Sequence, residues 1–252
     1  MSKKIDILGV RVDDISRDEA TANILRLAKA RSRGNYVVTV NSEFVMMARR
    51  NRDFARILAS SDLALADGQW VVISKLILGC KAHDRITGVD LVENLCRKVA
   101  NRPITIGFLG GFGDVATRVA KRQKKLSDGL KVVFTAACDP TIGSDLRLKA
   151  LLDKAGRIDI LFVAFGMGRQ ELWIERMRKS VNVGVYIGVG GAFDYLAGVK
   201  KRAPRLLQVW GLEWLWRLAL EPSRVWRMRV LPAFFGLMLI NLLKRQILTS
   251  SK

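Results

Sequence analysis

The sequence predicts an α/β protein with a mostly parallel sheet and helices on both faces. Over residues 1–200, short apolar or β-branched segments alternate with amphipathic segments, which is the pattern of strand–helix–strand units. Glycines and polar residues follow several apolar segments directly, as expected at the carboxyl ends of parallel strands. Half of the 252 residues are hydrophobic, so the chain can bury a full core as one large domain or two small ones.

Seven short segments are predicted as strands because they are apolar or rich in β-branched residues. In chain order they are Ile5–Val10, Tyr36–Val40, Asp62–Ala66, Ile104–Leu109, Lys131–Ala136, Ile158–Ala164 and Val183–Val189. Several of them end at a glycine or at an Asp-Gly pair, which are residues that favour a turn. The sheet therefore has a row of turns at one edge.

Five segments between these strands are predicted as helices. They are Asp18–Ala30, a segment that begins after Asn41 or Ser42, Gln69–Leu78, Asp114–Leu126, and a segment after Gly168 that runs to Lys179. In the first of them apolar residues recur at helical spacing on one face. Asn41 and Ser42 are both good N-cap residues for the second.

The last fifth of the chain differs in composition from the rest. Residues 200–252 hold 11 basic and 2 acidic residues, a net charge of +9 out of +20, and four of the six tryptophans. They also hold the apolar stretch Val230–Leu243, which Pro232, Gly236 and Asn241 interrupt. We therefore divide the chain into an α/β domain, residues 1–199, and a basic, Trp-rich helical appendage, residues 200–252.

The appendage has the composition of a segment that lies in a lipid interface. Arginine and tryptophan beside a short apolar helix are typical of such segments, and each basic residue near an anionic leaflet contributes about 1 kcal/mol. The stretch is about half as long as a bilayer span requires, and the sequence has no run of 18 apolar residues. The sequence thus indicates peripheral attachment to an anionic membrane surface. The alternative is a helix that packs on the protein itself or on a second copy in a homo-oligomer.

Composition argues against several kinds of site and partner. Cys80, Cys96 and Cys138 are too few and too scattered for a disulfide framework. One histidine and no paired cysteines argue against zinc, and the absence of an Asp-x-Asp triplet weakens the case for carboxylate-held Mg²⁺ or Mn²⁺. Neither a metal nor a cofactor is expected. The positive charge suits phosphate-bearing substrates or anionic lipid, whereas no nucleic-acid reading element is recognisable.

Ligands of such a sheet bind beyond the carboxyl ends of its strands, which selects the candidate site residues. Those that follow predicted strands are Thr39, Asn41, Asp67, Gly110, Gly111, Gly113, Gly166, Gln170, Gly190, Gly191 and Asp194. Asp67 can take a proton from a hydroxyl nucleophile, although Asp-Gly is also a common turn. Arg85 can hold a phosphate by two parallel hydrogen bonds, or else pair with Asp84 or Asp90.

A glycine-rich turn offers a second interpretation. Gly111–Ala116 fits the pattern G-x-G-x-x-A after a strand, in which backbone N–H groups approach a phosphate. This favours an NAD(P)-binding oxidoreductase, but a nucleotide-sugar diphosphate fits the same turn. No carboxylate ends the next strand at the usual spacing of about 20 residues to hold a ribose. A tight strand-to-helix turn without a ligand remains the third alternative.

Seven short motifs follow one another along the chain. They are Thr39-Val40-Asn41, Ala66-Asp67-Gly68, Arg85-Ile86-Thr87-Gly88, Gly190-Gly191-Ala192-Phe193-Asp194, Arg202-Ala203-Pro204, Gly211-Leu212-Glu213-Trp214 and Arg217-Leu218-Ala219-Leu220-Glu221-Pro222-Ser223-Arg224. Each motif alone is modest, but together and in this order they closely resemble the WecG/TagA/CpsF glycosyltransferases. The resemblance runs from about Ile5 to Arg229.

The resemblance implies a fold, an activity and a location. It implies a Rossmann-like sheet and the metal-independent transfer of a sugar, with inversion, from a UDP-sugar to a polyprenyl-diphosphate-linked saccharide. Such enzymes build bacterial surface polysaccharides, among them exopolysaccharides and teichoic-acid linkage units. They sit on the cytoplasmic face of the inner membrane as peripheral proteins, attached by a C-terminal appendage.

The resemblance also implies roles for individual residues. Asp67 is the expected catalytic base, with Thr39 and Asn41 as catalytic residues beside it. Arg85 is expected to engage a diphosphate and Gln170 a sugar. The remaining expected substrate-binding residues are Gly110, Gly111, Gly190, Gly191 and Asp194 in the body and Arg217, Arg224 and Arg227 in the appendage. This chain departs from the family pattern before Gln170, where Gly168-Arg169 replaces Pro-Lys.

Overall fold

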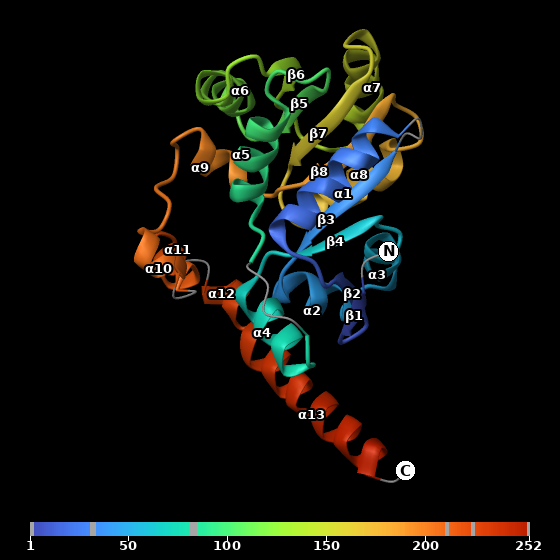
Figure 1. The fold of residues 1–252 in the computed structure, drawn as a ribbon, viewed down its shortest axis with the longest axis vertical. Coiled ribbons are helices and arrows are strands. Elements are labelled where there is room, and N and C mark those ends of the chain that lie inside the picture. The colour runs from blue at the N-terminus through green and yellow to red at the C-terminus, as the bar shows by residue number, and fades with distance from the viewer. Residues whose placement is uncertain (1–2, 31–33, 81–84, 210–211, 223–224, 251–252) are drawn as a thin grey trace.

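A six-stranded parallel sheet forms the centre of the computed structural model, which describes residues 3–30, 34–80, 85–209, 212–222 and 225–250. The strands are β3 (Asn35–Val40), β4 (Leu63–Ala66), β5 (Thr105–Gly110), β6 (Lys131–Ala136), β7 (Ile158–Ala164) and β8 (Val183–Gly188). Their spatial order is β4-β3-β8-β7-β5-β6 (Figure 1). The predicted α/β class with a parallel sheet is confirmed.

The N-terminal strand is a hairpin, so the prediction of one strand over Ile5–Val10 is wrong. β1 (Lys4–Ile7) and β2 (Val10–Asp13) pair antiparallel around Leu8 and Gly9, whose φ angles are 53° and 92°. A two-residue hairpin turn of type I′ has positive φ at both central positions. The Oδ2 of Asp13 accepts a hydrogen bond of 2.7 Å from the Ala64 N–H, so the hairpin covers the β4 edge of the sheet.

Helices cover both faces of the sheet and bury two hydrophobic clusters against it. One cluster is formed with α1 (Arg17–Lys29), α5 (Gly88–Val99), α6 (Val115–Leu126) and α9 (Ala192–Leu196). The other is formed with α2 (Ser42–Arg50), α3 (Arg52–Ala59), α4 (Gln69–Ile77), α7 (Ile142–Lys154) and α8 (Arg169–Met177). The inner strands are buried on both sides, which is why they read as unbroken apolar runs.

The helix predictions hold with small shifts at the ends. Asn41 is the N-cap of α2, and its Oδ1 accepts a hydrogen bond of 3.1 Å from the Phe44 N–H. Asn51 ends this helix and caps α3, so the expected single helix is two. The sequence reading missed α5 and α7. α5 begins after Thr87, whose hydroxyl accepts from the Asp90 N–H.

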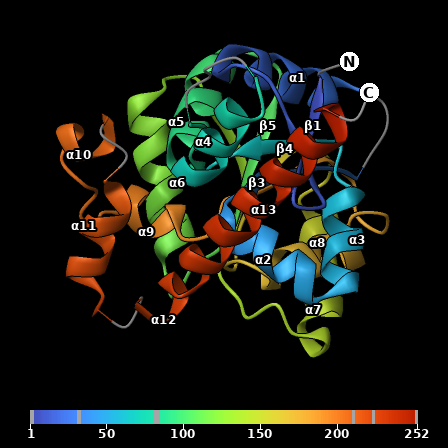
Figure 2. The same ribbon diagram turned by 90° about the horizontal axis from the view of Figure 1, so that it is seen from below.

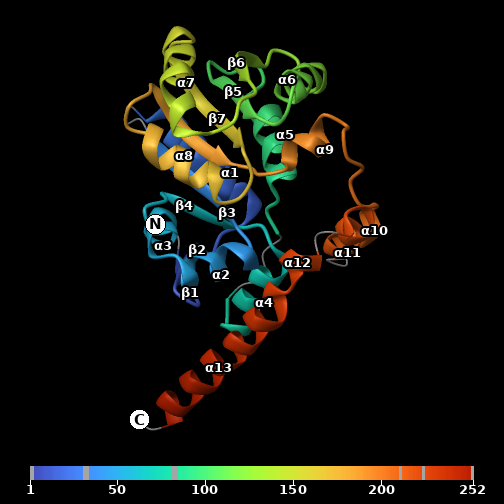
Figure 3. The same ribbon diagram turned by 180° about the vertical axis from the view of Figure 1, so that it is seen from behind.

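The described residues of the appendage form four helices: α10 (Arg205–Val209), α11 (Glu213–Leu220), α12 (Val225–Met228) and α13 (Val230–Ser250). α13 is continuous through Pro232, because a proline in the first turn has no intrahelical N–H bond to lose. It projects from the body in Figures 1 and 3 and lies across α2 in Figure 2. Phe234 and Met238 are buried in the cluster that includes α2, and Phe235 meets Trp70 edge-on at 4.5 Å.

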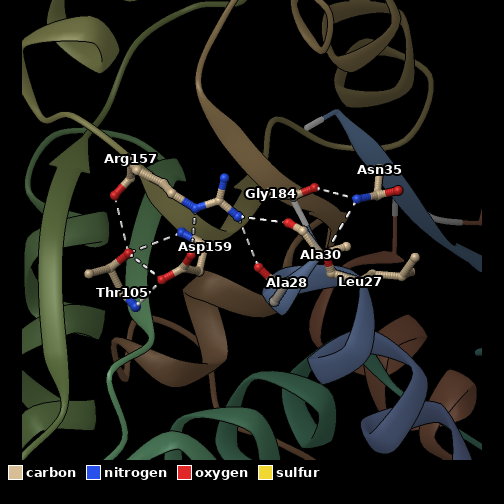
Figure 4. Close-up of polar contacts among 8 residues, drawn as sticks. All are labelled: Leu27, Ala28, Ala30, Asn35, Thr105, Arg157, Asp159 and Gly184. Atoms are coloured by element: carbon tan, nitrogen blue, oxygen red, sulfur yellow. Dashed lines mark hydrogen bonds and ion pairs between the residues drawn. The ribbon is translucent and has the colours of Figure 1, made fainter. Parts of the chain in front are cut away.

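A polar network joins three elements at the amino-terminal edge of the sheet (Figure 4). Asp159 accepts from the Thr105 N–H at 2.8 Å and from Arg157 Nε at 2.9 Å. The same guanidinium donates to the carbonyls of Ala28 and Ala30 at the end of α1, each at 3.1 Å. These bonds tie β5, β7 and α1 together.

Candidate active site

The topology of the sheet predicts a ligand-binding crevice between the carboxyl ends of β3 and β8. The helix after β3 packs on one face of the sheet and the helix after β8 on the other, so the chain diverges at this point. Such a divergence at the carboxyl ends of parallel strands opens a ligand-binding crevice. The loops that follow β3, β4, β7 and β8 therefore converge here.

Asp67 and Asn41 lie in adjacent loops at this crevice. The N–H groups of Asp67 and Gly68 donate to the Val40 carbonyl at 2.9 and 3.3 Å. A Cβ added to Gly68 would lie 2.9 Å from the Asn41 Cβ, so the two loops are in close contact. Asp67 is half-buried, which suits a carboxylate at the mouth of a crevice.

Thr39 lies in the floor of the crevice. Its side chain is buried, and its hydroxyl donates to the Gly188 carbonyl at 2.9 Å. The bond continues the pairing of β3 with β8 beyond the last register pair, Val37 with Ile187. The side chains of Thr39 and Asn41 thus make hydrogen bonds within the protein that fix the ends of β3 and β8 and the start of α2. Asp67 is the acidic residue among the three expected catalytic residues.

A buried network lies over the end of β8. The Gln170 Oε1 accepts from the Gly190 N–H at 2.9 Å, and its Nε2 donates to Glu171 Oε1 at 2.7 Å. The other carboxylate oxygen of Glu171 accepts from the Gly168 N–H at 2.6 Å. The sequence analysis did not select Glu171. A glutamate at the third position of a helix often accepts a hydrogen bond from the backbone N–H at the helix start, and this signal is present in the sequence.

Arg85 is paired with a residue of the appendage. Its Nη2 lies 2.5 Å from Glu213 Oε2, and the two side chains are 16% and 3% exposed. The Ile86 N–H donates to the Ala66 carbonyl at 2.9 Å, so Arg85 sits next to the end of β4 and to Asp67. The expected alternative pairing with Asp90 is not formed, and Asp84 lies outside the described residues.

Further ion pairs join residues 200–221 to the body. Arg202 lies 2.8 Å from Asp90, and Lys200 lies 3.2 Å from Asp194 and 2.7 Å from Glu221. Burial acts to raise the pKa of Asp90, but hydrogen bonds from Arg202 and Thr87 outweigh it and lower that pKa. Asp194, expected to bind substrate, is thus a partner of the appendage.

The glycine-rich turn after β5 is tightly packed. Gly110 has φ of +114°, and a Cβ there would lie 2.6 Å from the Ala164 carbonyl oxygen. The Gly111 N–H donates to the same oxygen at 3.1 Å, so this amide is already used within the protein. The turn lets β5 pass close to β7, and neither glycine offers a side chain or this N–H to a phosphate.

The remaining expected site residues lie in loops or outside the described part of the chain. Gly190 has its N–H bonded to Gln170, and nothing lies within 4 Å of a Cβ added to Gly191. Arg217 is in α11 and Arg227 in α12, but their side chains, and all of Arg224, lie outside the described residues.

Within the described ranges no three His, Cys, Asp or Glu residues form a group that could hold a metal. Over the same ranges, no helix has the length and apolar character that a bilayer crossing requires. A cavity of about 430 Å³, lined by Lys29, Arg157 and Asp159 among others, lies at the amino edge, away from the crevice.

Comparison with known proteins identifies the family. A model of the glycosyl transferase WecG/TagA/CpsF family matches residues 5–247. The chain belongs to this family. It is therefore a glycosyltransferase of cell-envelope polysaccharide biosynthesis, and the NAD(P)-dependent oxidoreductase is dropped as an alternative.

Two relatives of this family member have curated names. Both are named N-acetylglucosaminyldiphosphoundecaprenol N-acetyl-beta-D-mannosaminyltransferase. The protein of Bacillus spizizenii is 32% identical over 203 residues, which are 81% of this chain and 78% of the relative. The protein of Staphylococcus aureus is 27% identical over 237 residues, which are 92% of this chain and 90% of the relative.

Proposed function

We propose that this transferase moves an N-acetylhexosamine, of the N-acetylmannosamine type, from a UDP-sugar to a polyprenyl-diphosphate-linked saccharide, with Asp67 as general base. The observation that carries the proposal is the position of Asp67 at the end of β4, beside Asn41 and one loop from Arg85. The names of the relatives support the sugar and the undecaprenyl-diphosphate-linked acceptor.

The reaction is a single displacement with inversion. The acceptor hydroxyl oxygen forms a bond to the anomeric carbon while its proton passes to the Asp67 carboxylate. The bond from that carbon to the diphosphate oxygen breaks, and UDP leaves with the electron pair. A carboxylate within hydrogen-bond reach of the attacking hydroxyl contributes about 10²–10⁴-fold to such a step. Inversion gives the β linkage that the names of the relatives contain.

Cationic side chains stabilise the departing diphosphate in this proposal. Arg85 presents a planar guanidinium that can bind two phosphate oxygens at once. Arg217, Arg224 and Arg227 of the appendage are the further basic residues that we assign to the diphosphate. Gln170 holds the turn of Gly190 and Gly191, which contacts the donor sugar, and Thr39 and Asn41 hold the loops that carry Asp67. Gly110 and Gly111 pack the turn after β5 against the end of β7, and Asp194 pairs with Lys200 of the appendage. The reaction needs no metal or cofactor.

The appendage, residues 200–252, binds the membrane surface and brings the site to the lipid-linked acceptor. The distal part of α13 and the adjacent end of α4 (Figures 1 and 3) expose large apolar side chains. These are Leu76, Ile77, Leu239, Ile240 and Leu243. An exposed apolar patch on a basic segment favours an anionic lipid interface, here the cytoplasmic face of the bacterial membrane.

Replacement of the base tests the proposed function. We expect Asp67→Asn to lower the rate of transfer from UDP-N-acetylmannosamine to a lipid-linked N-acetylglucosamine analogue by about 10³-fold. The melting temperature should stay within a few degrees of the parent. Asp114→Asn is the matched control, because Asp114 also follows a strand of this sheet but is exposed and caps nothing with its side chain. Turnover retained by Asp67→Asn removes this residue from the mechanism.

A further inference from the structure

We infer that Glu171 is a positioning residue for glycosyl transfer: its carboxylate holds the Gln170 carboxamide in one orientation and thereby sets the turn after β8. The inference rests on the proposed placement of the active site at the ends of β3, β4 and β8. It adds a residue that does not touch substrate itself.

Both ends of the Gln170 carboxamide are committed. Its Oε1 faces the Gly190 N–H, which is a donor, and its Nε2 faces the Glu171 carboxylate, which accepts. Rotating the carboxamide by half a turn would place a donor against a donor and an oxygen against an oxygen. Glu171 thus decides which atom Gln170 turns toward Gly190. Its second oxygen, bonded to the Gly168 N–H, anchors the arrangement to the start of α8.

The space over the end of β8 is shaped for this pair. A Cβ added to Gly188 would lie 2.7 Å from Gln170 Nε2 and 3.1 Å from Glu171 Oε1. The carbonyl of the same glycine accepts from Thr39, on the neighbouring strand. The pair therefore fills a place that any other residue at position 188 would occupy, directly below the crevice between β3 and β8.

The charge state of Glu171 changes in the physiological range. Burial raises the pKa of Glu171 to about 7, against hydrogen bonds from Gln170 and Gly168 that act to lower it. Tyr36 of β3 is the titratable side chain that interacts electrostatically with Glu171, and the same phenol also interacts with Glu175 of α8 and with Arg178, the residue that caps the end of α8. Burial, with Glu171 as the next cause, keeps the pKa of Tyr36 well above its usual value, so this phenol stays neutral while Glu171 titrates.

Ionised Glu171 accepts both of its hydrogen bonds, whereas the protonated form turns one oxygen into a donor. Protonation therefore loosens the hold on Gln170. We expect the rate of transfer by the parent enzyme to rise with pH through about 7, and we assign this rising limb of the pH–rate profile to Glu171. A residue with a merely structural role would not produce such a limb.

The test compares Glu171→Gln with Glu175→Gln, a control one turn further along α8, where the carboxylate is partly exposed and paired with Arg178. We expect Glu171→Gln to lower kcat/KM by roughly 10–10²-fold and to remove the limb near pH 7, since misplacement of a substrate contact by about 1 Å can have an effect of this size. Glu175→Gln should keep the parental kcat/KM and the limb near pH 7. A folded Glu171→Gln enzyme with parental kcat/KM, or with the limb intact, overturns the inference.

A second measurement needs no variant at residue 171 and no activity. In the parent protein, the NMR signals of the Gln170 side-chain NH₂, assigned by their loss in Gln170→Ala, should shift with a midpoint near pH 7. Signals that stay constant from pH 5 to 9 overturn the inference even if Glu171→Gln fails to fold. Because this readout is independent of substrate, it separates failure of the inference from failure of the proposed transfer reaction, which Asp67→Asn tests.

Discussion

At the scale of single residues, a buried carboxyl links stability to pH in this protein. Glu171 has no exposed surface, and its pKa moves from an ordinary 4.5 to about 7 because burial disfavours the charged form. The ionised form that we assign to catalysis is therefore the form that the fold tolerates less well. Such opposition between activity and stability is common at functional sites.

The sign of the pH effect on stability follows from this shift. Between pH 4.5 and about 7 the folded protein keeps the Glu171 proton and the unfolded chain releases it. The stabilising contribution is therefore complete below pH 4.5 and is lost as the pH rises to about 7, with a total of about 3 kcal/mol. Urea unfolding of the parent and of Glu171→Gln at pH 5 and pH 8 measures it. We expect the difference in unfolding free energy between the two proteins to change with pH; equal slopes would contradict the assignment.

At the scale of elements, ion pairs connect the appendage to the loops around the crevice. α11 supplies Glu213 to Arg85, and the segment before α10 supplies Arg202 to Asp90. The pair of Arg85 with Glu213 is well buried, so removal of one partner leaves a charge without compensation. In the proposed reaction, the diphosphate of the donor and Glu213 compete for the same guanidinium.

Glu213→Gln tests this competition. The change leaves Arg85 without its carboxylate, so we expect UDP to bind roughly tenfold more tightly, a gain of about 1.4 kcal/mol, while the melting temperature falls. Isothermal titration calorimetry measures the affinity. Glu221→Gln serves as control because Glu221 pairs with the more exposed Lys200 and should leave UDP affinity unchanged. Unchanged or weaker UDP binding by Glu213→Gln would show that Glu213 does not compete with the diphosphate.

The distal part of α13 is the element proposed to meet lipid. The substitutions Leu239→Ser, Ile240→Ser and Leu243→Ser, made together, remove exposed apolar surface and leave the buried Phe234 and Met238 in place. We expect the partition coefficient onto phosphatidylglycerol vesicles to fall by about 10–10²-fold in a sedimentation assay. The matched control replaces Ile142 and Leu146, exposed apolar residues of α7 at the far end of the molecule in Figure 1. Equal vesicle binding by the triple variant rejects the lipid-facing role.

At the scale of the whole molecule, the two edges of the sheet differ in what their polar groups do. At the amino edge, Arg157 and Asp159 bond to one another and to the backbone of α1. At the carboxyl edge, Asp67 and Arg85 stand next to each other at the end of β4, and the appendage reaches them through Glu213. The appendage thus extends from the crevice along α11 and past α4 to the end of α13 (Figures 1 and 3).

The sequence by itself determined the alternation of strands and helices, the parallel sheet and the position of Asp67 after β4. These follow from local features, since apolar periodicity and an Asp-Gly turn depend only on neighbouring residues. It misread the first hairpin because Leu8-Gly9 turns the chain inside an apolar run, and it did not show that the short helix predicted over Val230–Leu243 continues to Ser250 as α13.

Only the tertiary structure decided which side chains meet. Glu213 lies 128 residues from Arg85, and Gly188 lies 149 residues from Thr39, so neither contact leaves a local pattern. Local sequence likewise does not show the charge state of Glu171, because that state depends on the burial of its carboxyl group where α8 packs on the sheet. Burial and long-range pairing arise from the packing of distant segments, and the free energy of a charge depends on that packing.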